Sequence, residues 1–514
     1  MTRSDYSFEM STNNKSKHTI NNDQIKKAFD FNQLGQENPK ILQSMNTSIS
    51  GIGTTIKSEA GKKIGTHDEP KSERSSHGEE STVEVFFQTM IPFIIAGLGS
   101  ICAGLLLNRV QKTHLVCEVP QFIAMCPPLQ GMKGNLDMTF TSRLSTEAHQ
   151  GRLERSSRLV KHILMNMALI QAQAVGISLF AALITFALNA LETDAHEEIP
   201  VKNFLFLGSN ALFAMSAACL ISSTALVFLV VLTYTFSINP DNVATPLASS
   251  FGDLLTIGAM IGVATQYHPL ASISIVIPIS VICCFIVMVP FWLYVAHHDE
   301  HAWVAARQQG PTFFLAAILS SGAGIIQAFA LKSFPELTVY QPLITGVAGN
   351  RAGLQSARIS SYINTYQGVE KLTPRFDPWD YYTSPDPESR TALLILLTSP
   401  PYHLLFVFVS HTIAFLAFEP LKLSFVFIAG YMCTVLIQIF FLVYISQIIV
   451  YSLHRFGVDP DMHAIPMVTS IGDLVGTSLL FALFYVMSFG DDFVLKSSTM
   501  SEEPSNATTI CSYE

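Results

Sequence analysis

PDNVATPLASSFGDL, residues 240–254, recurs later in the chain as PDMHAIPMVTSIGDL, residues 460–474. The two segments share eight identical residues at the same spacing, and both end in Gly-Asp-Leu. A second pair repeats in the same order, because GMKGN at 131–135 recurs as GVAGN at 346–350. The two motifs occur in the same order in each half of the chain, and their copies are separated by nearly the same number of residues. This pattern indicates a tandem duplication.

The composition predicts a membrane protein. The chain has 514 residues, of which 49% are hydrophobic and 13% are charged, and its mean hydropathy is +0.37. These values lie outside the usual range of soluble domains. The net charge of −9 excludes the basic surplus that nucleic-acid binding requires, so no nucleic acid is expected as a partner. Most cysteines lie in apolar runs, where they act as small hydrophobic residues, and we expect no structural disulfides.

The apolar runs predict an all-α polytopic protein with about eleven membrane spans. Each span needs about 20 mostly apolar residues to cross the hydrocarbon core of the bilayer. The predicted spans are 84–109, 115–142, 161–190, 203–236, 243–266, 269–296, 312–331, 339–361, 392–418, 421–451 and 463–489. The second, fifth, eighth and eleventh carry the repeated motifs and are interrupted by Gly, Pro and polar residues.

The repeats divide these spans into two copies of five, with the sixth span left over. An odd number of spans would invert the second copy, so the extra span lets both copies enter the membrane from the same side. We therefore expect parallel repeats, a pseudo-dimer within one chain, related by an axis along the membrane normal. The predicted parts are a disordered cytosolic tail at 1–82, the first repeat at 83–267, a linking helix and loop at 268–311, the second repeat at 312–490, and an extracellular tail at 491–514.

Basic residues in the short loops predict the orientation. Arg and Lys gather after the second span, from Arg143 to Lys161, and after the eighth, from Arg358 to Arg390. By the positive-inside rule, both loops are cytosolic, so the N-terminus is expected in the cytosol and the C-terminus outside. Asn506 begins an Asn-Ala-Thr glycosylation acceptor on the C-terminal tail, which agrees with an external C-terminus. The plasma membrane is the expected location.

The repeated Gly-Asp places one carboxylate at bilayer depth in each copy. An ionised Asp in a membrane helix is costly unless it is paired, hydrated or bound to a cation, so it marks a functional site by default. Asp253 lies about ten residues into the fifth span, and Asp473 holds the matching place in the eleventh. If the repeats face each other, the two carboxylates converge at the axis, where a divalent ion can neutralise both.

Other oxygen-bearing residues extend this predicted metal site. Asn242, Thr245 and Ser249 lie on the same helical face as Asp253, at spacings of three and four residues. The Gly-x-x-Gly-Asn motifs are expected to break the second and eighth spans near mid-membrane, exposing backbone carbonyls and two amides. The amides belong to Asn135 and Asn350, and the first copy adds the carboxylate of Asp137.

A set of oxygen ligands without Cys or His favours a hard cation. Mg²⁺ keeps much of its water, so one or two carboxylates and several acceptors for its hydration shell suffice. Two plainer interpretations stay open. The Gly-Asp pairs could be packing glycines beside paired aspartates, and Gly-x-x-Gly-Asn could serve helix packing alone.

The paired motifs resemble solute carrier family 41, the animal magnesium transporters, which are distant relatives of the bacterial MgtE magnesium channel. The resemblance covers about residues 83–490. It implies that each repeat corresponds to one five-helix channel subunit, with the pore aspartates at Asp253 and Asp473. It also implies Mg²⁺ as transported substrate and Na⁺ as a possible coupling ion. Gating and energy coupling are not carried over from the channel.

Three functions are compatible with the sequence. The first is transport of Mg²⁺ between the repeats, and the second is transport of another divalent metal or an organic cation. The third is an intramembrane aspartyl protease, which also places two aspartates on facing membrane helices. The near-identity of the surroundings of Asp253 and Asp473 and the absence of a Pro-Ala-Leu element argue against the protease.

Overall fold

The structure is a computed structural model that describes residues 82–149, 156–192, 201–236, 240–365, 374–417 and 423–489. The predicted tails at 1–82 and 491–514 lie outside these residues except for Thr82. The described residues form helices joined by short turns and loops, with no strand among them. Its elements are α4 (Thr82–Val110), α5 (His114–Glu118), α6 (Gln121–His149), α7 (Ser156–Glu192), α8 (Val201–Thr235), α9 (Pro240–Ile273), α10 (Val276–Ala296), α11 (Glu300–Leu331), α12 (Leu337–Thr365), α13 (Pro378–Thr383), α14 (Pro387–Ala417), α15 (Phe425–Arg455) and α16 (Pro460–Met487).

The predicted all-α polytopic membrane fold is confirmed. Nine of the described helices are long and apolar enough to cross a membrane. The two long helices outside that set are α6 and α12, which carry the Gly-x-x-Gly-Asn motifs. Each has 29 residues, enough to span the hydrocarbon core, but a more polar sequence. Their polar side chains are buried against other helices, so they do not face lipid.

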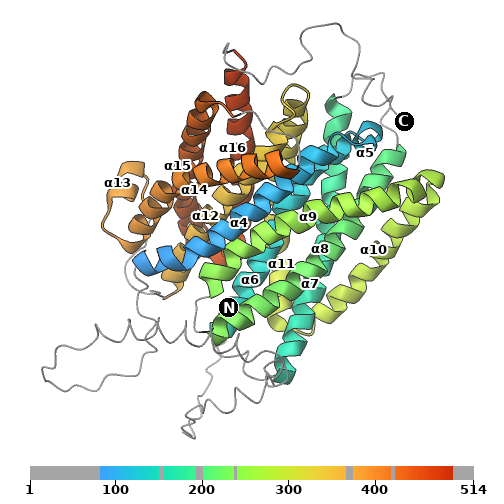
Figure 1. The fold of residues 1–514 in the computed structure, drawn as a ribbon. Helices are drawn as coiled ribbons and strands as arrows, with labels where there is room; N and C mark the ends of the chain where they lie inside the picture. The colour runs from blue at the N-terminus through green and yellow to red at the C-terminus, as the bar shows by residue number, and fades with distance from the viewer. Residues whose placement is uncertain are drawn as a thin grey trace, which may run out of the picture. The chain divides into compact units, whose positions relative to one another are not determined.

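The two halves pack their helices in the same way. In the first half, α4 packs against α9 and also reaches α12; in the second, α11 packs against α16 and also reaches α6. Figure 1 shows α4 and α9 lying side by side. Glycines permit both cross-half contacts, because a β-carbon at Gly104 would meet the carbonyl of Val339 and one at Gly324 would meet that of Ala124. This correspondence supports the predicted duplication.

Among the described helices, α10 has no counterpart in this pattern. It packs mainly against α7 and α8, and only 6% of its apolar window is buried. This fits the predicted linking span, which adds one crossing at the edge of the bundle and leaves its apolar surface for lipid.

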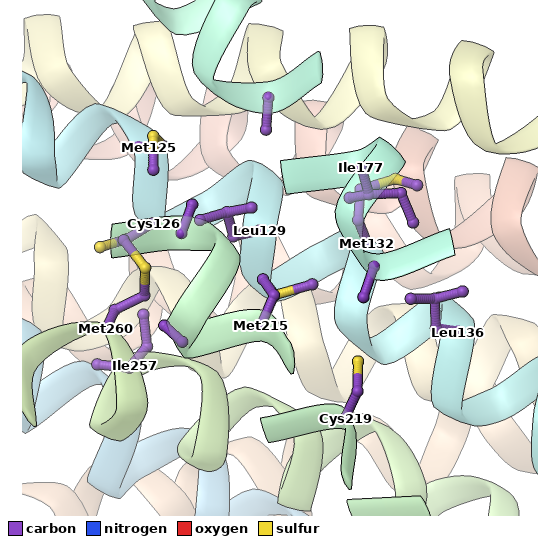
Figure 2. Packing of buried hydrophobic residues seen from close by; sticks show 14 of the residues in the cluster. Met125, Cys126, Leu129, Met132, Leu136, Ile177, Met215, Cys219, Ile257 and Met260 are labelled. Carbon is purple, nitrogen blue, oxygen red and sulfur yellow. The ribbon is translucent and has the colours of Figure 1, made fainter. Parts of the chain in front are cut away.

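Helix α6 owes its central place to two different faces. Its apolar face carries Met125, Leu129, Met132 and Leu136 at spacings of three and four residues, and these pack against α7, α8 and α9 (Figure 2). The opposite face carries the polar residues and glycines of the site described below. Burial of the apolar face positions the polar one inside the bundle.

Two local predictions are wrong. The second span is not one helix from 115 to 142, because α5 ends at Glu118 and α6 begins at Gln121, on either side of Pro120. The Gly-x-x-Gly-Asn motifs do not break their helices, since α6 and α12 continue through them. The glycines serve close packing instead, because neighbouring side chains fill the space where β-carbons would stand.

Candidate ion-binding site

A small cavity lies where α6, α9, α12 and α16 meet. Its volume is about 20 Å³, enough for one or two water molecules. Both halves contribute to its wall in similar measure. The lining residues are Pro127, Gln130, Gly131, Asn135, Ser249, Asp253, Gln341, Thr345, Gly346, Gly349, Asn350, Thr469 and Asp473.

The two repeated aspartates line this cavity together. Asp253 on α9 is 3% exposed, and its Oδ2 accepts a hydrogen bond of 3.5 Å from the hydroxyl of Ser100 on α4. Asp473 on α16 accepts a hydrogen bond of 2.8 Å at Oδ2 from the hydroxyl of Ser320 on α11. Both pairs are 153 residues apart in sequence, so each half builds the same Ser-Asp contact.

Each aspartate packs against a glycine of the opposite half. A β-carbon at Gly131 would overlap Oδ2 of Asp473, and one at Gly346 would lie 2.9 Å from Oδ2 of Asp253. One turn along α6 from Gly131, a β-carbon at Gly134 would lie 3.8 Å from Oδ1 of Asp253. Both carboxylates therefore approach a single turn of α6, which brings them close together.

Amide groups complete the wall. The Oδ1 atom of Asn135 accepts a hydrogen bond from the hydroxyl of Thr469, and its Nδ2 donates to Ser470 over 3.4 Å. These contacts join α6 to α16 across the two halves. The Oε1 atoms of Gln130 and Gln341 are buried and have no hydrogen-bond partner among the described residues. A buried acceptor left unsatisfied is costly, and a cation or a water molecule in the cavity would satisfy both.

The structure brings together five of the eight residues in the predicted metal site. Asp253, Asp473, Asn135, Asn350 and Ser249 all line the cavity. Asp137 does not, because it forms a fully buried ion pair with Lys133 on the same helix. The two remaining residues, Asn242 and Thr245, belong to α9, but their side chains lie outside the described part of the structure.

Several residues of the site are not among those predicted from the sequence. The serines Ser100 and Ser320 lie in strongly apolar spans, where a single hydroxyl attracts no notice. A signal exists, because Ser-x-x-Ala-Gly at 100–104 recurs as Ser-x-x-Ala-Gly at 320–324, at the same offset that relates the two aspartates. Gln130 and Gln341 do not occupy matching positions, so the repeat could not reveal them.

The chemistry of the wall suits a hard cation. Carboxylate, amide and hydroxyl oxygens line the cavity, and no Cys or His is among its lining residues in the described part of the chain. No cluster of three or more His, Cys, Asp or Glu residues that could hold a metal occurs among the described residues. An ion held here would therefore combine two carboxylates with neutral oxygens or waters.

The chain matches a protein-family model described as MgtE, divalent cation transporter, over residues 126–263 and 341–483. The chain belongs to the MgtE family. The first residues of the two matched segments are separated by the same number of positions as the two Gly-x-x-Gly-Asn motifs. Their last residues are separated by the same number of positions as the two Gly-Asp motifs, so the family match follows the internal repeat. As a member of this family with several membrane-spanning helices, the chain is a divalent cation transporter and a multi-pass membrane protein.

Members of solute carrier family 41 are similar over most of the MgtE-family chain. Member 3 from Mus musculus is 31% identical over 424 residues, covering 81% of this chain and 85% of the relative. Member 2 from Xenopus laevis is 31% identical over 416 residues, covering 80% and 73%. Member 2 from Homo sapiens is 30% identical over 415 residues, covering 80% and 71%. The predicted resemblance to this family is confirmed.

Proposed function

We propose that the protein transports Mg²⁺ along a path through the cavity, with Asp253 and Asp473 as the charged ligands. The observation that carries the proposal is the convergence of one carboxylate from each half on a single turn of α6. Two like charges this close inside a membrane are strongly unfavourable without a cation. A divalent ion removes both charges at once.

Neutral oxygens around the carboxylates favour an ion that binds partly through water. Asn135, Asn350 and Ser249 each offer an oxygen at the wall, and the unsatisfied oxygens of Gln130 and Gln341 add two acceptors. A Mg²⁺ ion with six waters exceeds a cavity that holds one or two water molecules. The ion must therefore exchange most of its waters for protein oxygens here, or the four helices must separate as it passes.

The orientation of the protein and its coupling ion are proposed from the sequence and from the family resemblance. The loop charges favour a cytosolic N-terminus and an external C-terminus, and we propose the plasma membrane as the location. The family resemblance favours exchange against Na⁺. A protease is disfavoured because the carboxylates pack against glycines in a cavity of about 20 Å³, which leaves no space for a peptide backbone.

Uptake by proteoliposomes tests the proposal. Purified protein is reconstituted around a Mg²⁺-sensitive dye, and uptake is compared between the wild type and Asp253→Asn, with and without a sodium gradient. The wild type should take up Mg²⁺, and the variant should lose nearly all uptake while keeping its elution volume and its melting temperature within a few degrees. Full uptake by the folded variant would overturn the proposal. Competition by Co²⁺, Ni²⁺ or choline would rank the other substrates.

A further inference from the structure

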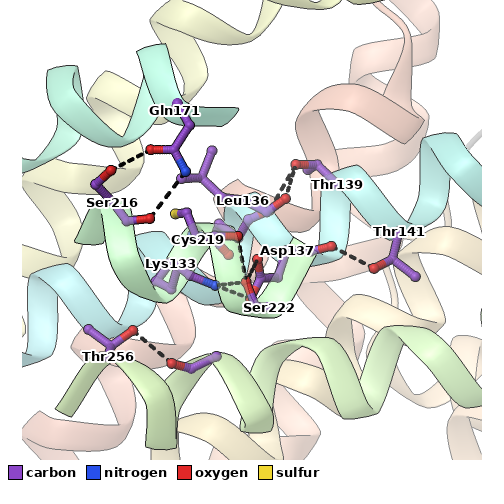
Figure 3. A network of polar contacts seen from close by, with 12 residues as sticks. Lys133, Leu136, Asp137, Thr139, Thr141, Gln171, Ser216, Cys219, Ser222 and Thr256 are labelled. Carbon is purple, nitrogen blue, oxygen red and sulfur yellow. Dashed lines mark hydrogen bonds and ion pairs between the residues drawn. The ribbon is translucent and has the colours of Figure 1, made fainter. Parts of the chain in front are cut away.

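A second set of charges lies directly beside the cavity and outside its wall. Lys133 and Asp137 on α6 are both fully buried and form an ion pair. Ser222 of α8 joins them, because its hydroxyl donates to Oδ1 of Asp137 over 3.0 Å and accepts from Nζ of Lys133 at 2.5 Å. Figure 3 shows the three side chains converging between α6 and α8. The proposed transport path makes no direct use of them.

This ion pair packs against the residue that precedes Asp253. A β-carbon at Gly252 would lie 2.8 Å from Oδ2 of Asp137 and 3.8 Å from Cγ of Lys133. On α6, the residue after Lys133 is Gly134, whose absent β-carbon would lie 3.8 Å from Oδ1 of Asp253. The lysine stem and the Asp253 carboxylate are therefore close neighbours, with only glycines between their helices.

No Lys or Arg is among the cavity-lining residues in the described part of the chain, so these residues give the ion site no fixed cation of its own. When the transported ion leaves, the two carboxylates repel each other in a medium of low dielectric constant. Lysine carries its charge on a flexible four-carbon stem, so its ammonium group can change partner by rotating side-chain bonds alone.

We propose that Lys133 is a tethered counter-cation of the transport site, whose ammonium group pairs with Asp137 when the ion is bound and moves to Asp253 when the ion leaves. The inference rests on the proposed function, because it assumes that Asp253 binds the transported ion. At Asp253, the ammonium group lowers the cost of the empty site, and so it weakens ion binding and assists release.

The duplication supplies only one such lysine. At the offset that relates the two Gly-x-x-Gly-Asn motifs, the counterparts of Lys133 and Asp137 are Ala348 and Ala352. The one charged residue nearby in the second copy of the motif is Arg351, whose Nη1 atom donates to Ile395 and Ser399 on the side of α14. One movable cation shared among the carboxylates of Asp253, Asp473 and Asp137 leaves the ion-free group with a net charge of about −2, which still attracts a divalent ion.

The test compares the concentration dependence of Mg²⁺ uptake among four proteins in liposomes. Asp137→Asn weakens the resting partner of the ammonium group, so Lys133 should occupy Asp253 more often and raise the KM about tenfold. The double variant Lys133→Met/Asp137→Asn removes the movable cation without changing net charge. It should lower the KM below that of the wild type and also lower the maximal rate. Lys202→Met, at an exposed lysine whose Nζ donates to the Ser272 carbonyl, is the matched control and should leave both values unchanged.

The KM should rise in Asp137→Asn and fall in the double variant, and these opposite shifts distinguish a movable counter-cation from a structural ion pair. A purely structural ion pair would change the amount of folded protein, measured by size-exclusion chromatography, and leave the KM of the folded fraction unchanged in both variants. That result, or KM shifts in the same direction, would overturn the inference alone. If Asp137→Asn does not fold, the KM of the double variant is compared with that of the wild type, and a KM that is not lowered would overturn the inference. No uptake by the wild type would overturn the proposed function, and the inference with it.

Discussion

The carboxylate of Asp473 on α16 occupies the space where Gly131 on α6 would carry a β-carbon. The matching contact joins Asp253 to Gly346 on α12. Each half of the duplicated chain thus provides a carboxylate for one side of the cavity and a glycine that receives the carboxylate of the other half. Neither half can form the site alone, which explains why the two copies keep both motifs.

Adding a methyl group at Gly131 should displace the Asp473 carboxylate. Gly131→Ala is expected to reduce transport at least tenfold, and Gly346→Ala less, because its β-carbon would be 2.9 Å from the carboxylate oxygen rather than overlapping it. Alanine favours a helix over glycine by about 1 kcal/mol, so helix propensity does not explain a loss. Gly258→Ala on α9 is the control, since no atom lies within 4 Å of the position that its β-carbon would take. Equal activity of Gly131→Ala and Gly258→Ala would contradict this account.

The two serines that donate to the aspartates should contribute unequally to Mg²⁺ binding. Ser320 donates to Asp473 over 2.8 Å, whereas Ser100 donates to Asp253 over 3.5 Å. A hydrogen bond to a charged group contributes about 1.5–3 kcal/mol, and it weakens as the distance grows. Ser320→Ala should therefore raise the KM for Mg²⁺ by about tenfold or more and Ser100→Ala by less, in the same uptake assay. A larger effect at Ser100 would show that the hydroxyl contacts do not set ion binding.

The buried guanidinium of Arg351 should stabilise the second half through its shape. It lies over the ring of Phe93 at 5.0 Å and that of Tyr402 at 4.5 Å. Its Nη1 donates to the hydroxyls of Thr398 and Ser399. Because lysine cannot reproduce the planar stacking and the fork of donors, Arg351→Lys should destabilise the protein by about 2 kcal/mol. The melting temperature in detergent measures this, and Tyr402→Phe, which keeps the ring, should change it little. An unaltered melting temperature for Arg351→Lys would refute the prediction.

The segment before α14 should respond to acid. The guanidinium of Arg375 and the hydroxyl of Ser384 hold the pKa of Asp386 below its ordinary value. A lowered pKa stabilises the folded segment above the unfolded pKa of about 3.9, and this stabilisation is lost as the pH falls through the folded value. The pair is half-exposed, so it contributes less than about 1 kcal/mol. Hydrogen exchange of residues 374–386 should rise below about pH 4 in the wild type relative to Asp386→Asn. Parallel profiles would contradict the assignment.

The sequence draws attention to Asp253 and Asp473 because a carboxylate in a membrane helix is costly and because the same Gly-Asp motif occurs in both copies. Few roles other than function keep Gly-Asp at the same depth in both copies. The helices around it follow from apolar length, and their order is that of the predicted spans. The polar α6 and α12 are recognised as spans only because they carry repeated motifs, since their hydropathy alone does not mark them.

The sequence does not predict the role of a residue when that role depends on which residue lies next to it in the folded structure. Glycines in α6 are compatible with a broken helix or with close packing, and only the position of Asp473 decides between them. Asp137 looks like a further ligand until Lys133, one turn away, is found to pair with it. A lysine four residues from an aspartate is common on exposed helices, so the spacing does not reveal a fully buried pair.

The most direct test of the central claim is a double-mutant cycle on Asp253 and Asp473. Affinity for Mg²⁺ is measured by titration calorimetry on the wild type, Asp253→Asn, Asp473→Asn and the double variant. If both carboxylates bind one ion, each single change removes most of the binding free energy, and the double variant loses much less than the sum of the two. Losses that add fully, as for two independent sites, would contradict a shared ion between the two halves of the chain.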